Sequence, residues 1–240
     1  MNTERLVPDR IRSRYSLKIA ATLALVFAVT LVSAAFFYGN VAGELGSSAD
    51  AALGADANES AETAELWVDA NADLATGVAA TEAVESGDAE RIDEYLAGAA
   101  AGSDRVGAIH YVEDGRIAAS SASSAVGQSL SVATPEGTES VAVDEPRDAV
   151  VGNGSVIPVV APAGENGYVV VAGAAETLRN RLADEKYDTA LAAGDEVVLA
   201  AGDQERAAGA TELAANGTAT GTVGETELVA ATAAVSGTGW

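Results

Sequence analysis

The chain has 240 residues, with 36 acidic side chains against 13 basic ones and a formal net charge of −23. This charge excludes nucleic acid as a partner and disfavours an anionic lipid surface, because phosphate groups would be repelled. A hydrophobic fraction of 48% excludes a disordered acidic tail, and the absence of cysteine excludes disulfide bonds.

The first predicted element is a transmembrane helix over residues 19–38. These residues carry no charge, and a helix of this length spans about 30 Å, the thickness of a hydrocarbon core. Five basic residues precede it and the next basic residue is Arg91, so we expect residues 1–18 in the cytoplasm and residues 39–240 outside the cell. A cleaved signal peptide is the alternative. A retained anchor is favoured, because a secretory apolar region is usually about 7–15 residues long.

The part of the chain beyond this helix carries two surface signals. Its excess of acids and near absence of lysine are typical of proteins that stay soluble at very high salt, where self-repulsion is screened. Three N-x-S/T sequences also fall on this side, where glycosylation occurs. The predicted glycosylation acceptors are Asn58, Asn153 and Asn216.

Residues 39–105 are predicted to form a helical stalk. An alanine-rich helix over residues 41–85 ends at Ser86-Gly87, and Asp88 is suited to cap a second helix. Apolar residues recur in the first helix at spacings of three and four, which indicates one packed face rather than a ligand site. This face consists of Trp67, Ala70, Leu74 and Val78.

A hairpin follows, with its turn at Asp114-Gly115, a strong signal for a two-residue turn. Such a turn pairs Glu113 with Arg116. If the pairing continues without interruption, His110 lies opposite Ala119. Two further residues then share the other face of the hairpin, and these are Tyr111 and Ser120.

Two more hairpins are predicted further along. The second has Asn166-Gly167 in its turn, and the common parity of Pro158 and Pro162 predicts that their side of the strand faces an edge or a bulge. A helix over residues 174–185 leads to a third hairpin around Gly194-Asp195. A polar, Gly/Thr-rich stretch and a last strand complete the chain, so the fold class is α+β, with two stacked units of antiparallel sheet.

These patterns resemble a known family. The basic segment "RIRSRYSLKIAATLALVF" is similar to the start of haloarchaeal methyl-accepting chemotaxis transducers, and "GAIHYVEDGRIAASSAS" and "ALAAGDEVVLAAG" look like hairpins of their double-Cache sensor region. The resemblance implies a transmembrane helix, a long helix and two PAS-like (Cache) units. The implied units are a distal one over residues 106–185 and an incomplete proximal one over residues 186–240.

The chain departs from this family in two ways. It stops at Trp240, where the family continues into a second membrane span, so we expect a chain truncated before that span. The aromatic–Arg–Trp/Tyr cluster of amino-acid-sensing Cache domains has no counterpart in "SSASSAVGQSLSVATPEG". An amino-acid ligand is therefore not supported by residue matching.

No catalytic machinery is visible, and no metal or cofactor site is predicted. His110 is the only histidine, and a half-buried strand histidine is favoured over a ligand or a base. The stretch from Asp69 begins like a calcium loop but has Leu74 where glycine is needed and Ala80 where glutamate is needed. No nucleophile elbow or phosphate-binding loop is present. The chain is therefore expected not to be an enzyme.

A small-molecule site over one face of a sheet is implied by the family. Arg147 stands out, because a lone arginine can hold a carboxylate. The alternative, which is favoured, is an ion pair with Asp144 or Asp148. The candidate ligand-binding residues are Tyr111, Ser120, Asp144, Arg147 and Tyr168.

The favoured function is the membrane-anchored extracellular sensor domain of a chemotaxis transducer, as a homodimer by analogy with the family. The alternatives are the ectodomain of a sensor histidine kinase and a membrane-tethered surface glycoprotein without a signalling role. An anchored hydrolase is disfavoured because catalytic groups are missing.

Overall fold

The computed structural model describes residues 48–135, 141–164, 167–184, 186–194, 196–213, 219–223, 226–236, 238 and 240. Contacts divide the chain into two units, Met1–Ala52 and Leu53–Trp240. Of the first unit, residues 48–52 are described, and they are helical. Within the described part of the chain, no helix is both long enough and apolar enough to cross a membrane. The predicted transmembrane helix over residues 19–38 lies outside the described residues.

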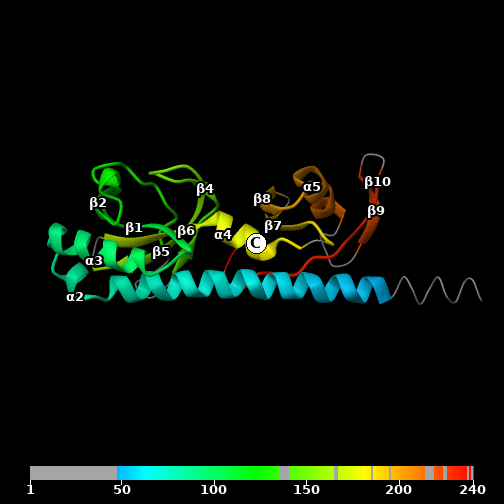
Figure 1. Ribbon diagram of the computed structural model, residues 1–240, viewed down its shortest axis with the longest axis horizontal. Coiled ribbons are helices and arrows are strands. Elements are labelled where there is room, and N and C mark those ends of the chain that lie inside the picture. Colours follow the sequence, from blue (N-terminus) through cyan, green and yellow to red (C-terminus); the bar gives the residue numbers. More distant parts are fainter. Residues whose placement is uncertain are drawn as a thin grey trace, which may run out of the picture. The chain divides into compact units, whose positions relative to one another are not determined.

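In the second unit, residues 53–79 form a long helix (Figure 1). The predicted continuation to residue 85 is wrong. At Thr81 the backbone N–H bonds to the carbonyl of Val78, and the hydroxyl of Thr81 donates to the same carbonyl over 2.7 Å. This competition with the helical pattern ends the long helix, and a separate short helix follows, α2 (Glu82–Glu85).

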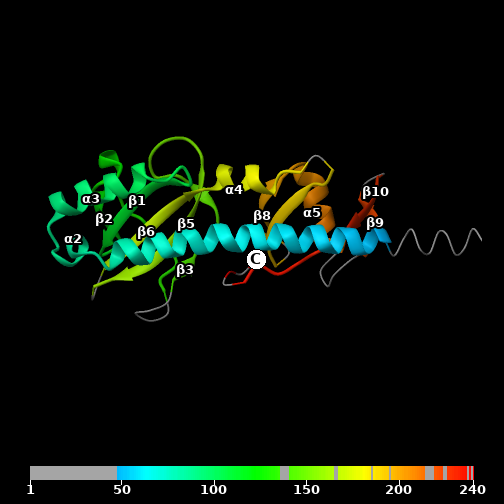
Figure 2. The ribbon, with the colours of Figure 1, turned by 60° about the horizontal axis from the view of Figure 1, so that its bottom comes forward.

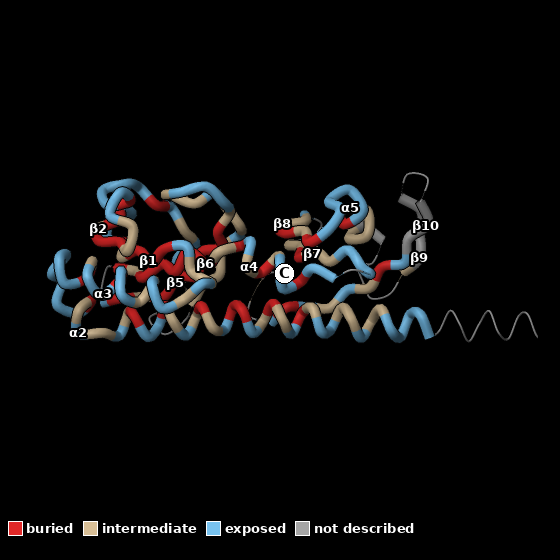
Figure 3. Tube along the Cα trace, in the orientation of Figure 1, coloured by how far each residue is buried: buried red, intermediate tan, exposed pale blue. Residues whose placement is uncertain are grey.

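One face of the long helix is buried, as predicted, but its position differs slightly (Figure 3). Trp67 and Val78 are buried, whereas Ala70 and Leu74 are only partly buried. The buried positions recur at spacings of three and four. They are Ala61, Ala64, Trp67, Val68, Asn71, Ala75 and Val78.

The second predicted helix is confirmed as α3 (Ala89–Ala101). The carboxylate of Asp88 accepts a hydrogen bond from the backbone N–H of Glu90 over 3.1 Å, so Asp88 is the N-terminal cap that the sequence indicates. Ile92 and Leu96, four residues apart, are its buried side chains. They join α3 to the long helix and to the sheet in one hydrophobic cluster.

A six-stranded antiparallel sheet follows, with the order β2-β1-β6-β5-β3 and with β4 also paired to β5. The chain between β3 and β4 passes Pro158, whose carbonyl accepts the N–H of Asp144 over 2.9 Å. This break agrees with the predicted edge or bulge beside the prolines. The strands are β1 (Val106–Glu113), β2 (Arg116–Ser120), β3 (Ala142–Val143), β4 (Arg147–Asp148), β5 (Ser155–Ala163) and β6 (Gly167–Ala174).

Two smaller sheets and two helices complete the second unit. The helix predicted over residues 174–185 is α4 (Ala175–Leu182), and the third predicted hairpin is β7 (Thr189–Ala193) with β8 (Glu196–Ala201). The strands β9 (Ala219–Val223) and β10 (Thr226–Ala230) form a separate pair.

The stretch after β8, for which no helix was predicted, contains a helix, α5 (Gln204–Leu213). The carboxylate of Asp203 accepts the N–H groups of Glu205 and Arg206, over 3.0 and 3.1 Å, and Ala207 is buried. Its sequence QERAAGATEL consists mostly of good helix formers, so propensity, capping and the burial of Ala207 all favour the helix, and the Gly/Thr-rich part of the stretch begins only after it.

Candidate functional site

The two faces of the six-stranded sheet are covered by different elements (Figures 1 and 2). The long helix, α2 and α3 pack on one face, which we call the helix face; for example, Leu96 and Val78 cluster there with Ile109. Residues 121–135, which we call the covering segment, and residues 149–151 lie over the opposite face, which we call the covered face. Because strand side chains alternate between faces, one set of residues forms the covered face. This set is Ala108, His110, Val112, Ile117, Ser120, Val160, Tyr168, Val170 and Ala172.

The first hairpin has the predicted turn but not the predicted register throughout. Glu113 pairs with Arg116, and Asp114 and Gly115 have φ values of 50° and 73°, which two-residue hairpin turns require. The register then shifts between Tyr111 and Val112, so that His110 lies opposite Ser120 rather than Ala119.

This shift is a β-bulge, with one extra residue on β2. Its consequence is that Ser120 changes face. The prediction that Tyr111 and Ser120 share a face is therefore wrong: Ser120 lies on the covered face, and Tyr111 lies on the helix face. The bulge brings together two polar side chains that an uninterrupted register would have separated.

Those two polar side chains are hydrogen-bonded to each other. Nδ1 of His110 lies 2.8 Å from the hydroxyl of Ser120, and both residues are buried, at 2% and 3% exposure. The hydroxyl also accepts the N–H of Ala122 over 3.0 Å, which a group with one proton and two acceptor positions allows. The backbone N–H of Ser120 donates to Asp93 of α3 over 2.6 Å. Ser120 thus joins β2, α3 and the start of the covering segment.

Burial lowers the pKa of His110 from 6.5 to about 4, so its imidazole is neutral at pH 7. A neutral imidazole can act as donor and as acceptor, and the rest of the covered face near it is aliphatic, with Val112 and Val170 as neighbours along the strands. His110 is more deeply buried than the half-buried strand histidine that was expected. The sequence signal that pointed to it was its place in an otherwise apolar strand.

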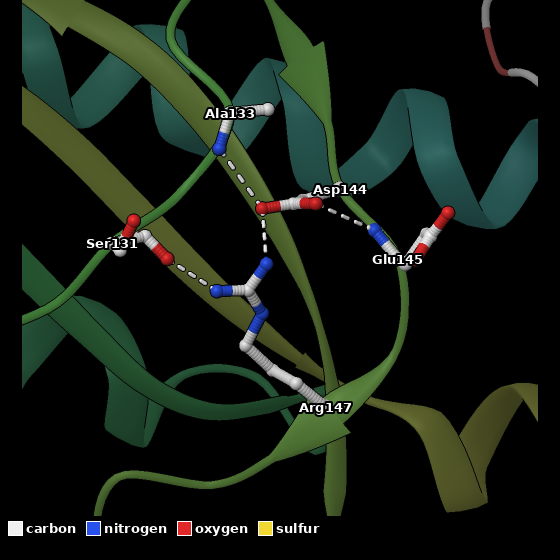
Figure 4. Close-up of polar contacts among 5 residues, drawn as sticks. All are labelled: Ser131, Ala133, Asp144, Glu145 and Arg147. Atoms are coloured by element: carbon white, nitrogen blue, oxygen red, sulfur yellow. Dashed lines mark hydrogen bonds and ion pairs between the residues drawn. The ribbon is translucent and has the colours of Figure 1, made fainter.

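Arg147 and Asp144 form an ion pair, the alternative that the sequence favoured (Figure 4). Asp144 also accepts the N–H groups of Ala133 and Glu145, each over 2.9 Å, and Arg147 donates to the carbonyl of Ser131. These bonds tie the covering segment around residues 131–133 to the chain between β3 and β4. Arg147 and Asp144 therefore hold the covering segment in place, with both charges matched to each other.

The two candidate tyrosines lie on opposite faces. Tyr168 is partly buried and packs with Val112 on the covered face. Tyr111 packs among the helix-face residues, where burial and then the nearby Glu113 raise its pKa. A Cβ built at Gly167 would lie only 2.7 Å from the Tyr111 hydroxyl oxygen, which explains glycine at the start of β6. The structure thus groups Ser120 and Tyr168 with His110 and separates Tyr111 from them.

The predicted glycosylation acceptors differ in environment. Asn153 is exposed between Gly152 and Gly154, both with positive φ, in the turn before β5. Asn58 is exposed on the long helix, but its side-chain amide donates to the carbonyl of Gly54 over 2.7 Å. Asn216 lies outside the described residues. Among the residues that the structure describes, no group of three or more His, Cys, Asp or Glu side chains could hold a metal ion.

No protein-family model matches the sequence, and no curated protein matches it significantly. Solved structures match the fold. The ligand-binding domain of the Pseudomonas aeruginosa PAO1 amino acid chemoreceptor PctB, in complex with L-Arg, has a TM-score of 0.59 at 11% identity, over 78% of this chain and 89% of that one. The ligand-binding domain of the Pseudomonas fluorescens chemoreceptor CtaA, in complex with L-alanine, has a TM-score of 0.55 at 13% identity, over 75% and 87% of the chains.

The chain has the fold of a chemoreceptor ligand-binding domain. The likeness covers most of both chains, so it concerns more than one hairpin. The proteins named here that share this fold are ligand-binding domains of chemoreceptors. The identities are low enough that the likeness concerns the fold and not the binding residues.

Proposed function

We propose that this chain is the extracellular small-molecule sensor domain of a chemotaxis transducer, anchored in the membrane by residues 19–38. The observation that carries the proposal is the fold, which matches a chemoreceptor ligand-binding domain over 78% of the chain. The charge asymmetry around residues 19–38 supports the orientation, with residues 1–18 in the cytoplasm. The acid-rich exterior suits a domain that works in strong salt.

In this proposal residues 39–105 are the stalk, residues 106–185 the distal unit and residues 186–240 the proximal unit. The chain acts as a homodimer. Asn153 is the best of the glycosylation acceptors, because it lies exposed in a turn, whereas the amide of Asn58 is engaged with its own helix.

The ligand binds on the covered face of the six-stranded sheet, close to His110 and Ser120. Buried polar side chains are scarce in the described part of the chain: Asn71, His110 and Ser120 are the ones found there, and Asn71 bonds to the carbonyl of Trp67 in its own helix. A ligand on the covered face would meet a hydroxyl and a neutral imidazole among aliphatic side chains. Tyr168 contributes from the same face.

The charges of Arg147 and Asp144 are already matched to each other at the covering segment, so they act by holding that segment over the ligand. Amino acids are bound by the domains of similar fold. Amino acids are therefore the first class to test, beside uncharged polar molecules that need no ionic partner.

The test is a thermal-shift screen of the full chain in lipid nanodiscs against amino acids, carboxylates, amines and sugars. We expect one class to raise the melting temperature, because a ligand that binds only the folded state stabilises it. Flat melting curves for all classes would favour a surface glycoprotein without a sensing role. A cell that lacks the chain should then lose its chemotactic response to the ligand found.

A matched pair of variants locates the site. Ser120→Ala removes the hydroxyl that lies beside His110 on the covered face. Ser121→Ala removes a neighbouring hydroxyl, which accepts the N–H of Ile109 over 2.9 Å. Both variants lose a hydrogen bond to the backbone, but only Ser120→Ala should weaken the ligand. Equal loss of affinity in the two variants would place the ligand elsewhere.

A further inference from the structure

A cavity of about 680 Å³ is lined by residues other than those of the covered face. It is formed by the long helix, the chain after α4, the strand β7, the helix α5 and residues 229–235 with Trp240. None of its lining residues, all of them described, belongs to the six-stranded sheet. Pockets that hold drug-sized ligands have volumes of about 300–1,000 Å³, so this cavity is large enough to bind one.

The buried part of the cavity, which we call its floor, is apolar, and many of the side chains that line the cavity are small. The cavity is partly open to solvent, so it is a cleft in the surface rather than a sealed void in the core. Small alanine side chains recur where the long helix, β7 and α5 line it, and they leave this space open. The buried residues of the floor include Ala61, Leu182, Leu191, Ala207 and Val235.

Two exposed cations line the cavity, and we call this exposed part of the lining its rim. Arg181 and Lys186 both line the cavity and are exposed, and neither has an ion pair with any described residue. Arg206, which also lines it, is engaged with Asp188 over 2.8 Å. Elsewhere in the second unit, Arg147 and Arg179 are paired with carboxylates, whereas Arg91, Arg105 and Arg116 have no ion pair with a described residue. Of the cations that line the cavity, Arg181 and Lys186 are the two without an ion pair to a described residue, and each can donate a charge-assisted hydrogen bond to a carboxylate.

Carboxylates limit which anion can bind. Asp56 and Glu59 of the long helix and Asp184 beside α4 also line the cavity. Their negative charges would repel a second anionic group on a ligand, so dicarboxylates and phosphates are disfavoured. A ligand with one carboxylate and an aliphatic chain suits the cavity, because the carboxylate can meet the exposed cations and the chain can contact the apolar floor.

We propose that this cavity is a second ligand site, which binds an aliphatic monocarboxylate through Arg181 and Lys186. The hydrocarbon part of the ligand lies on the alanine-rich floor. The proposal does not depend on a ligand at the covered face, because the two sites share no residue.

The probe is hexanoate, titrated by calorimetry into the full chain in lipid nanodiscs, with empty nanodiscs as the blank. Hexan-1-ol and hexylamine have the same chain length and serve as charge controls. We expect saturable binding of hexanoate and about tenfold weaker binding of the other two, because a charge-assisted hydrogen bond is lost. Equal binding of hexan-1-ol, stronger binding of hexylamine, or no saturable binding of hexanoate would overturn the proposal.

Charge variants test the rim. Arg181→Gln and Lys186→Gln should each weaken hexanoate about tenfold. Arg91→Gln is the matched control, since Arg91 is an exposed cation on α3 and lies outside the cavity. An equal effect of Arg91→Gln would show that only the overall charge matters and would overturn the assignment.

Filling variants test the floor. Ala210→Phe places a ring in the cavity and should abolish binding, whereas Ala208→Phe, on the exposed side of the same helix, should leave it unchanged. Melting curves show whether either phenylalanine variant fails to fold. If one does, the Arg181→Gln and Lys186→Gln variants decide whether the proposal holds. Hexanoate should still bind when the covered face is altered by Ser120→Ala. Loss of binding in that variant would overturn the second site without affecting the proposed sensor function.

Discussion

The indole of Trp67 occupies the space that a side chain at Gly173 would need. A Cβ built at Gly173 would lie 2.7 Å from Cζ2 of Trp67 and closer still to Cη2, and 3.3 Å from the carbonyl oxygen of Ile157. Trp67 is fully buried in the cluster that joins the long helix to β5, α4, β7 and β8. The contact therefore lies where the six-stranded sheet, the long helix and the smaller β7-β8 sheet meet.

The first prediction follows from this contact. Gly173→Ala should destabilise the second unit by about 1–3 kcal/mol, because overpacking a filled core forces side chains or backbone to move. Urea denaturation followed by tryptophan fluorescence measures the change. Gly98→Ala, on α3 with open space around it, is the matched control and should be neutral or slightly stabilising. Equal stability of the Gly173→Ala protein would show that Trp67 is not held against β6.

The second prediction concerns acid. The pKa of His110 is about 4 in the folded chain against 6.5 in the unfolded chain, so between these values the unfolded state binds more protons. Stability is then highest above pH 6.5 and falls as the pH is lowered towards 4, by about 3 kcal/mol. His110→Asn should flatten this part of the profile.

Carboxylates contribute to the pH dependence of stability at lower pH than His110 does. Hydrogen bonds from Ser236 lower the pKa of Glu65, and hydrogen bonds from the first turn of α5 lower that of Asp203, so their stabilisation is lost only below the ordinary carboxylate values of 4.5 and 3.8. The loss of stability due to His110 can therefore be distinguished, by its pH range, from the loss due to these carboxylates. Because the chain has one histidine, NMR of its ring protons measures the pKa directly. A measured pKa near 6.5 would contradict the buried, neutral imidazole.

The third prediction concerns the covering segment. Asp144→Asn removes the ion pair with Arg147 and weakens the bond to the N–H of Ala133. We expect a loss of about 1–2 kcal/mol and faster hydrogen exchange at Ala133, while the strand amides of β1 stay protected. Asp148→Asn, at an exposed position in β4, is the control and should change neither quantity. Unchanged exchange at Ala133 in the Asp144→Asn protein would rule out this role.

The fourth prediction uses the net charge of −23. Raising the salt concentration from about 0.1 M to about 1 M shortens the Debye length from roughly 10 Å to roughly 3 Å, so repulsion among surface carboxylates weakens. The melting temperature should rise steadily over this range. Sodium chloride and potassium chloride should act alike, since screening is not specific for the ion. A melting temperature that falls with salt would contradict a surface adapted to high ionic strength.

Much of the local structure could be predicted from the sequence. Asp88 caps α3, the Asp114-Gly115 turn forms, and Glu113 pairs with Arg116, because capping and two-residue turns depend on neighbouring residues alone. The α5 helix was missed although its sequence QERAAGATEL favours a helix and Asp203 is suited to cap it, because it was grouped with the Gly/Thr-rich residues that follow. The break at Thr81 was also missed, although the bond that marks it is local, since the Thr81 hydroxyl donates to the carbonyl of Val78 three residues earlier.

The five candidate ligand-binding residues stay a prediction, and the structure decides only which of them share a face of the sheet. Ser120 and Tyr168 were expected to face one pocket, and they share the covered face. Tyr111 was grouped with them and His110 was not, because an uninterrupted hairpin register was assumed. The bulge beside Tyr111 moves Ser120 from the face of Tyr111 to the face of His110, and nothing in the pattern of alternating side chains marks it.

The sequence by itself determined the α+β class, the turns, the helix cap and the acidic surface, all of which depend on composition or on residues close together along the chain. Only the tertiary structure decided that His110 meets Ser120, that Arg147 is matched by Asp144, and that Trp67 takes the place of a side chain at Gly173. Those contacts depend on strand register and on which surfaces pack together. Register and packing are set by the burial of the whole core, and no short stretch of sequence contains that information.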